Sequence, residues 1–153
     1  EYVTRAAEKL RKQKSVAGLL MVFLSTNRFK EGPQYNNSLS TTLFPPTAYT
    51  PELIKTALNL LDDLYLPGFE FKKAGVMLAD IIPEKDVPLS FMDTNYLDDK
   101  RKKLMEAIDK LNKTFGQDTL FYASSGIKKD WKMKRAKLSP HYTTHWNDIP
   151  KVK

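Results

Sequence analysis

The sequence has 153 residues, and 41% of them are hydrophobic, which is enough for the core of one ordinary domain or of two small ones. It contains no cysteine, so disulfide scaffolds and thiolate metal sites are excluded, and no apolar run approaches the roughly 20 residues that span a bilayer. We therefore expect a cytoplasmic, globular protein with no membrane partner.

The formal net charge of +7 is unevenly distributed along the chain. Residues 1–82 carry 10 Lys/Arg against 8 Asp/Glu, residues 83–99 carry 1 against 5, and residues 100–153 carry 14 against 5. An acidic segment with prolines thus separates a nearly neutral part from a strongly basic one. The pattern predicts a domain at 1–82, a linker at 83–95 and a small basic domain at 96–153.

The first part is predicted to have the order helix, strand, strand, helix, strand. Apolar residues near helical spacing indicate an amphipathic first helix: Val3, Ala6, Ala7, Leu10 and Ala17. The runs at 17–27, 36–44 and 69–81 are typical of strands, and the first of these is apolar enough to be covered on much of both faces. Thr50 as N-cap and Pro51 after it begin a helix that ends at Pro67-Gly68.

These elements predict an α+β fold, with a small antiparallel sheet and two helices on one of its faces. Because the chain opens directly with a helix, we expect a preceding strand to lie outside it, in a longer parent protein.

The uncovered face of this sheet is predicted to be small and polar. Ser38, Ser40 and Thr42 alternate along one strand and donate hydrogen bonds without bulk. Cations lie at or near the strand ends, at Arg28, Lys30, Lys72 and Lys73. Such a face suits a phosphate chain. The alternative is an ordinary solvated face, since alternating Ser and Thr are common on exposed strands.

Five stretches of this part resemble a known family: "AAEKLRKQ", "AGLLMVFLSTNRFK", "PQYNNSLSTTL", "TPELIKTAL" and "PGFEFKKAGVML". They are similar to the little-finger domain of Y-family translesion DNA polymerases of the UmuC type, the type found in bacterial DNA polymerase V. The tail "WKMKRAKLSPHYTTHW" resembles the small C-terminal region of UmuC-type proteins.

The resemblance implies an error-prone polymerase of the SOS response whose little finger grips template-primer duplex through the phosphate backbone. It implies the seven residues named above as DNA contacts, with weak dependence on base sequence. Phosphoryl transfer and its Mg ions would belong to a palm domain that this chain lacks, so the chain as given is expected to be non-catalytic and without a cofactor. The resemblance further implies a UmuD-type accessory subunit and RecA as partners.

The linker contains apolar residues within an acidic and polar stretch, which often marks a short docking motif. In UmuC-type proteins this position resembles the sliding-clamp-binding pentapeptide, which begins with Gln. The candidate residues here are Pro88, Leu89, Ser90, Phe91 and Met92, so Pro88 stands where Gln is expected. The alternative is that Phe91 and Met92 pack locally.

The basic part is predicted to contain a helix at 100–115, closed by Gly116, and a short strand at 118–126. Cations around Trp131 suggest nucleic acid or an acidic partner. His141 and His145 could ligate a metal on one helical face, but Pro140 and two threonines oppose such a helix, so no metal site is expected. We expect Tyr142 and Trp146 to bury against the helix of residues 100–115.

A second function from another class stays open. In that alternative, the chain is a protein-interaction module whose basic tail binds an acidic partner, and the sheet does not contact DNA. An independent enzyme is disfavoured because no carboxylate pair, nucleophile triad or phosphate loop in a catalytic pattern supports it.

Overall fold

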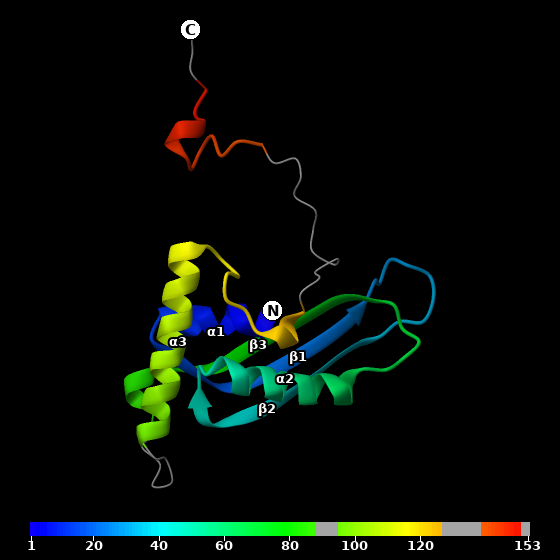
Figure 1. The fold of residues 1–153 in the computed structure, drawn as a ribbon. Helices are drawn as coiled ribbons and strands as arrows, with labels where there is room; N and C mark the ends of the chain where they lie inside the picture. Colours follow the sequence, from blue (N-terminus) through cyan, green and yellow to red (C-terminus); the bar gives the residue numbers. More distant parts are fainter. Residues whose placement is uncertain (88–94, 127–138, 151–153) are drawn as a thin grey trace. The chain divides into compact units, whose positions relative to one another are not determined.

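A computed structural model of the protein describes residues 1–87, 95–126 and 139–150. The chain divides into two compact units, Glu1–Phe121 and Tyr122–Lys153. The larger unit contains the sheet and all of the long helices that the structure describes (Figure 1).

The first five elements follow the predicted order. They are α1 (Tyr2–Lys12), β1 (Ser15–Thr26), β2 (Asn36–Thr47), α2 (Thr50–Leu64) and β3 (Phe71–Pro83). The strands form one antiparallel sheet in the order β2-β1-β3, so β1, the most apolar of the three, lies in the centre. The predicted α+β fold with a small antiparallel sheet is confirmed.

Both helices cover the same face of the sheet. Alternate side chains of β1, namely Leu20, Val22 and Leu24, are buried in a single core cluster. α1 contributes Val3, Ala7 and Leu10 to this cluster, and α2 contributes Leu53, Ala57 and Leu64. Burying a side chain of this size stabilises a fold by about 1.5–3 kcal/mol, so this one layer of packing holds the unit together. Among the residues that the structure describes, no helix covers the opposite face of the sheet.

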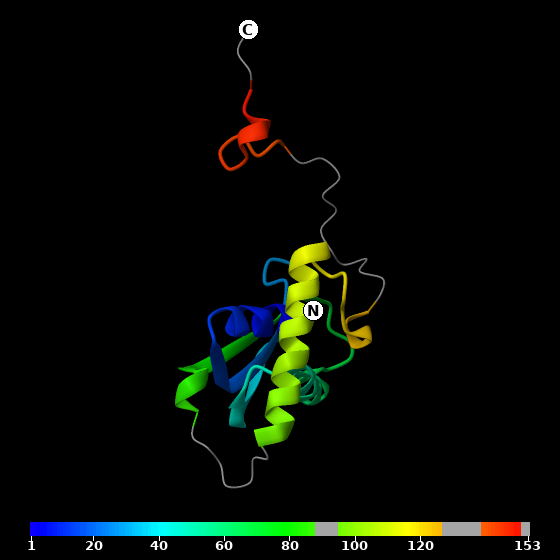
Figure 2. The ribbon, with the colours of Figure 1, turned by 60° about the vertical axis from the view of Figure 1, so that its left-hand side comes forward.

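A third helix, α3 (Asn95–Phe115), belongs to the same unit and runs past α1 (Figures 1 and 2). The Arg11 guanidinium joins them, because it donates two hydrogen bonds of 2.7 Å to the Asp109 carboxylate. It also donates to the Ala48 carbonyl at 2.9 Å and to the Thr50 hydroxyl at 2.7 Å. Met105 of α3 is buried as well. The division into 1–82, 83–95 and 96–153 stays a prediction, and in the structure α3 lies in one unit with the sheet.

Three local expectations differ from the structure. Ala17 belongs to β1 rather than to the first helix, which ends at Lys12. Thr50 is the first residue of α2 and Tyr49 is its N-cap; the Thr50 hydroxyl accepts a hydrogen bond from Arg11. Residues 118–126 form turns and a short 3-10 helix (Ala123–Ser125) instead of a strand. The Asn112 side chain of α3 accepts a hydrogen bond of 2.8 Å from the Leu120 backbone N–H and donates one of 2.9 Å to the Leu120 carbonyl. These two bonds take the place of those that a neighbouring strand would make.

The smaller unit contains a short 3-10 helix, Trp146–Asp148. The expected burial of Tyr142 and Trp146 against the helix of residues 100–115 would be a contact between the two units, and it stays a prediction. Within the smaller unit, the Asp148 carboxylate accepts a hydrogen bond of 3.0 Å from the His141 backbone N–H. No helix within the described ranges is long and apolar enough to cross a membrane.

Candidate nucleic-acid interface

The uncovered face of the sheet carries the predicted hydroxyl row. On β2, Ser38, Ser40 and Thr42 are exposed, whereas Leu39 and Leu43 between and beside them are partly or fully buried. Their partners across the ladder on β1 are Phe23, Met21 and Leu19. The alternation expected from sequence therefore places all three hydroxyls on the face that no helix covers.

The centre of this face is more apolar than expected. Leu19, Met21 and Phe23 of β1 are only partly covered, although the sequence suggested a strand covered on much of both faces. On β3, Met77 is 47% exposed and pairs with Met21, while Gly75 pairs with Phe23. The face thus has a polar edge along β2 and an apolar centre.

Gly75 lets the Phe23 ring lie flat against the sheet. A Cβ at position 75 would be 2.4 Å from the tip of that ring, far inside van der Waals contact. The glycine therefore allows the backbone of β3 and the Phe23 ring to come into close contact.

The four predicted cations gather at one end of the sheet, where β1 turns into β2 and β3 begins. Lys73 pairs with Ser25 in the ladder, and by register it lies on the uncovered face. A register shift between Ser25 and Thr26 accompanies Lys72, which is exposed as well.

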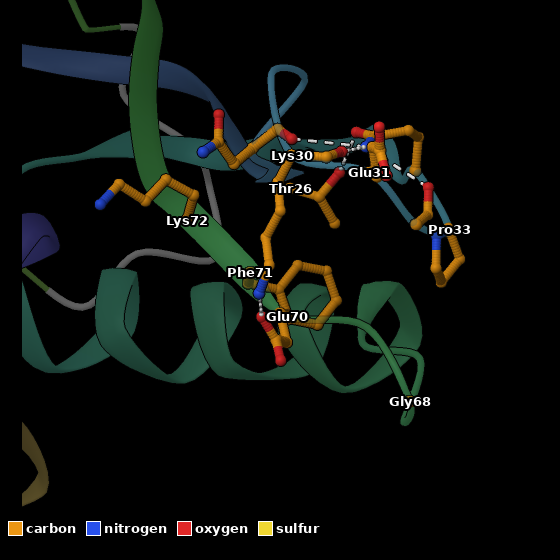
Figure 3. Close-up of a pocket in the computed structure, with 11 residues that line it drawn as sticks. Thr26, Lys30, Glu31, Pro33, Gly68, Glu70, Phe71 and Lys72 are labelled. Atoms are coloured by element: carbon orange, nitrogen blue, oxygen red, sulfur yellow. Dashed lines mark hydrogen bonds and ion pairs between the residues drawn. The ribbon is translucent and has the colours of Figure 1, made fainter.

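The other two cations have partners within the protein. The Lys30 ammonium forms an ion pair with Glu70, which ties the β1–β2 loop to the segment before β3 (Figure 3). That hydrogen bond and the charge of Lys30 lower the pKa of the Glu70 carboxyl below its ordinary value. The Arg28 guanidinium lies over the Phe29 ring, 4.8 Å from its centroid. Lys30 therefore presents less free charge than the sequence suggested.

An open hollow of about 410 Å³ lies between these two loops (Figure 3). Lys30, Glu70 and Phe71 line it together with Pro33, and Lys72 is directed away from the ion pair. Sequence reasoning missed Glu70 as the partner of Lys30, since a pair separated by 40 positions leaves no local pattern. It also missed Ser25 and Asn36, which face each other in the ladder at this end of the sheet.

The five residues of the candidate clamp motif, Pro88, Leu89, Ser90, Phe91 and Met92, lie outside the described residues, as does the basic run around Trp131. His141 and His145 lie 3.6 and 4.0 Å from the Asp148 carboxylate, both through Nδ1. In the part of the chain that the structure describes, no group of three or more His, Cys, Asp or Glu side chains is arranged to hold a metal ion.

The sheet and the helices on one of its faces make this unit a two-layer α+β domain, whose other sheet face carries the candidate site. A family model described as the impB/mucB/samB family C-terminal domain matches residues 1–91, and one described as a domain of unknown function (DUF4113) matches residues 102–152. The chain belongs to the impB/mucB/samB family, as a C-terminal domain of that family.

Curated relatives align over nearly the whole chain. Protein UmuC of Salmonella typhimurium is 39% identical over 153 residues, which are 99% of this chain and 36% of that protein. Protein SamB of Salmonella typhimurium is 36% identical over 100% of this chain and 36% of that protein. Protein MucB of Escherichia coli is 33% identical over 97% of this chain and 35% of that protein. The chain thus spans about a third of the length of these relatives, and its resemblance to the UmuC type is confirmed.

Proposed function

We propose that this chain is the DNA-gripping region of a UmuC-type translesion DNA polymerase, and that the uncovered sheet face holds the template-primer duplex. The supporting observation is the exposed row of Ser38, Ser40 and Thr42 on the same helix-free face as Lys73. Small hydroxyl donors can approach phosphate oxygens closely, while cations at the end of the face neutralise charge along the backbone.

Contacts of this kind would give an affinity that depends weakly on base sequence and strongly on salt, because binding releases the counterions of the phosphates. Such a grip suits a polymerase that copies damaged templates, since the distorted base is not what the protein reads. Phosphoryl transfer itself is assigned to a part of the parent protein outside this chain, with the residues here only holding the duplex.

The direct test is charge reversal at Lys72 and Lys73. We expect the Lys72→Glu/Lys73→Glu variant to bind primer-template DNA more weakly and with a shallower salt dependence, by roughly 0.9 in the log–log slope for each phosphate that is no longer neutralised. Fluorescence anisotropy of labelled DNA at several salt concentrations measures both quantities.

The matched control is Lys12→Glu/Lys55→Glu, which makes the same change in net charge on exposed lysines of α1 and α2. If this control weakens binding as much as the β3 variant does, only total charge matters and the sheet face is not the grip. If the β3 variant binds DNA as tightly as the parent chain does, the sheet face is likewise not the DNA grip.

A protein-interaction module is the second candidate, because Met77 of β3 is 47% exposed beside the partly covered Met21 and Phe23 on the uncovered face. Apolar area of this kind is more typical of protein contacts than of phosphate contacts. The partners to test under this proposal are a UmuD-type accessory subunit, RecA and, through residues 88–92, the sliding clamp. Binding of one of them that survives reversal of Lys72 and Lys73, without any binding of DNA, would favour this candidate.

A further inference from the structure

The tip of the β1–β2 loop exposes an aromatic ring that the fold does not use. Phe29 is 84% exposed and contributes nothing to the core. Single exposed hydrophobic residues are common on protein surfaces and need no explanation by themselves. The loop around Phe29 differs from an ordinary exposed loop because it is held in place by its own hydrogen bonds.

Gln34 makes most of the hydrogen bonds that hold this loop. Its side-chain N–H groups donate to the Lys30 carbonyl at 2.7 Å and, at longer distances, to the carbonyls of Asn27 and Gly32. Its side-chain oxygen accepts a hydrogen bond of 2.8 Å from the hydroxyl of Thr26, which is buried at the end of β1. The loop is therefore closed around one amide side chain and anchored to the sheet.

Two further contacts orient the tip. The Phe29 backbone N–H donates to the Asn27 side-chain oxygen at 3.2 Å, and the Lys30–Glu70 ion pair fixes the far side of the loop. Because these groups are already ordered, a ligand that binds the ring loses little loop entropy on binding.

The Phe29 ring and the cation beside it suit a flat, electron-rich ligand. The Arg28 guanidinium covers one side of the ring at 4.8 Å from the centroid, and the ring remains 84% exposed. An arginine beside an aromatic ring matches a nucleotide, since the ring stacks on the base and the cation neutralises the adjacent phosphate.

We propose that Phe29 stacks on an unpaired base of single-stranded DNA next to the duplex, with Arg28 beside it. Inside a duplex both faces of each base are already stacked, so only a single-stranded or unstacked base offers its face to a side chain. The loop lies at the end of the sheet that carries Lys73 and Asn36, where a strand leaving the gripped duplex would pass. This inference rests on the proposed function, because it requires duplex bound to the uncovered face.

The test compares two DNAs and two variants of the full chain. One DNA is a blunt duplex, and the other has the same duplex with a single-stranded template extension. The variants are Phe29→Ala and Phe115→Ala, since Phe115 is also an exposed ring, at 70%, but is the last residue of α3 and lies outside the sheet.

We expect the parent chain to bind the extended DNA more tightly than the blunt duplex. Phe29→Ala should lower the affinity for the extended DNA by roughly fivefold or more, which corresponds to the loss of about one base–aromatic stack. Its affinity for the blunt duplex and its salt dependence should stay unchanged. Phe115→Ala should match the parent on both DNAs, and Phe29→Trp should retain the preference for the extension.

The possible failures are distinguishable. If the parent prefers the extension and Phe29→Ala keeps that preference, or if Phe29→Ala weakens both DNAs equally, the stacking inference is wrong while the duplex grip stands. If the parent binds neither DNA, the proposed function fails and the inference fails with it.

Discussion

At the residue scale, Gly75 is the glycine, of the five at positions 18, 32, 68, 75 and 116, at which an added Cβ would meet the closest neighbour. Its Cα faces the Phe23 ring so closely that a Cβ would come within 2.4 Å of the ring tip. We expect Gly75→Ala to destabilise the fold by about 1–3 kcal/mol, because the ring must leave its place against β3. The free energy of unfolding from urea titration measures this cost.

The matching control is the same substitution in a Phe23→Leu background, where the obstructing ring is gone. There the cost should shrink or change sign, since alanine suits a strand better than glycine does. An equal cost in both backgrounds would show that the contact with Phe23 is not the cause.

The Lys30–Glu70 ion pair predicts a pH dependence of the loop end. The hydrogen bond from Lys30 and its positive charge lower the pKa of Glu70 from an ordinary value of 4.5. Since the folded pKa lies below the unfolded one, the pair contributes stability above about pH 4.5 and loses that contribution as pH falls through the folded pKa. The contribution is small because both side chains are exposed.

An NMR titration of the Glu70 carboxyl measures this directly. We expect Lys30→Met to return the Glu70 pKa to its ordinary range, while Lys72→Met leaves it lowered because Lys72 is directed away from the pair (Figure 3). A pKa that is indifferent to Lys30 would mean that the two loops are not joined by this pair.

At the element scale, the attachment of α3 depends on Arg11. Its side chain is 15% exposed and satisfies Asp109 with two parallel hydrogen bonds, besides the Ala48 carbonyl and the Thr50 hydroxyl. We expect Arg11→Met to destabilise the unit by about 1.5–3 kcal/mol, since it leaves a partly covered carboxylate without its partner. Arg11→Lys should recover only part of this, because an ammonium cannot form the paired geometry.

The control is Lys102→Met, which removes the ion pair of 2.8 Å between α3 and Glu84. Both of these side chains are about half exposed, so the loss should be at most about 1 kcal/mol. Comparable losses for Arg11→Met and Lys102→Met in chemical denaturation would contradict the view that burial makes Arg11 the main attachment.

The elements differ in how far the sequence could predict them. The strands and α2 were predictable because their side chains alternate or repeat with the period of the element that they form. The same alternation placed Ser38, Ser40 and Thr42 on one face. Pairs such as Arg11 with Asp109, 98 positions apart, leave no periodic signal, and the false strand at 118–126 arose because apolar residues there resembled one. The hydrogen bonds from the Asn112 side chain fix the conformation around Leu120, and this contact is visible only in the folded structure.

At the scale of the whole molecule, most of the net charge and the sheet with its core lie in different parts of the chain. Residues 1–121 carry 17 Lys/Arg against 16 Asp/Glu, whereas residues 122–153 carry 8 against 2, so nearly all of the net charge of +7 lies outside the unit that contains the sheet. A strong attraction to DNA measured on the full chain can therefore arise from the last 32 residues even if the sheet face does the gripping.

Ending the chain after Phe121 separates the two contributions. We expect the shortened chain to keep its cooperative unfolding, because the core, the Arg11–Asp109 pair and all three strands lie within it. Its affinity for duplex should fall at low salt, and its log–log salt slope should become shallower by about 0.9 for each phosphate that the tail had neutralised. The remaining binding should still be weakened by Lys72→Glu/Lys73→Glu. If the shortened chain folds but binds no duplex even at low salt, the basic tail is the DNA contact, and the uncovered face, with its exposed Met77, is left for a protein partner.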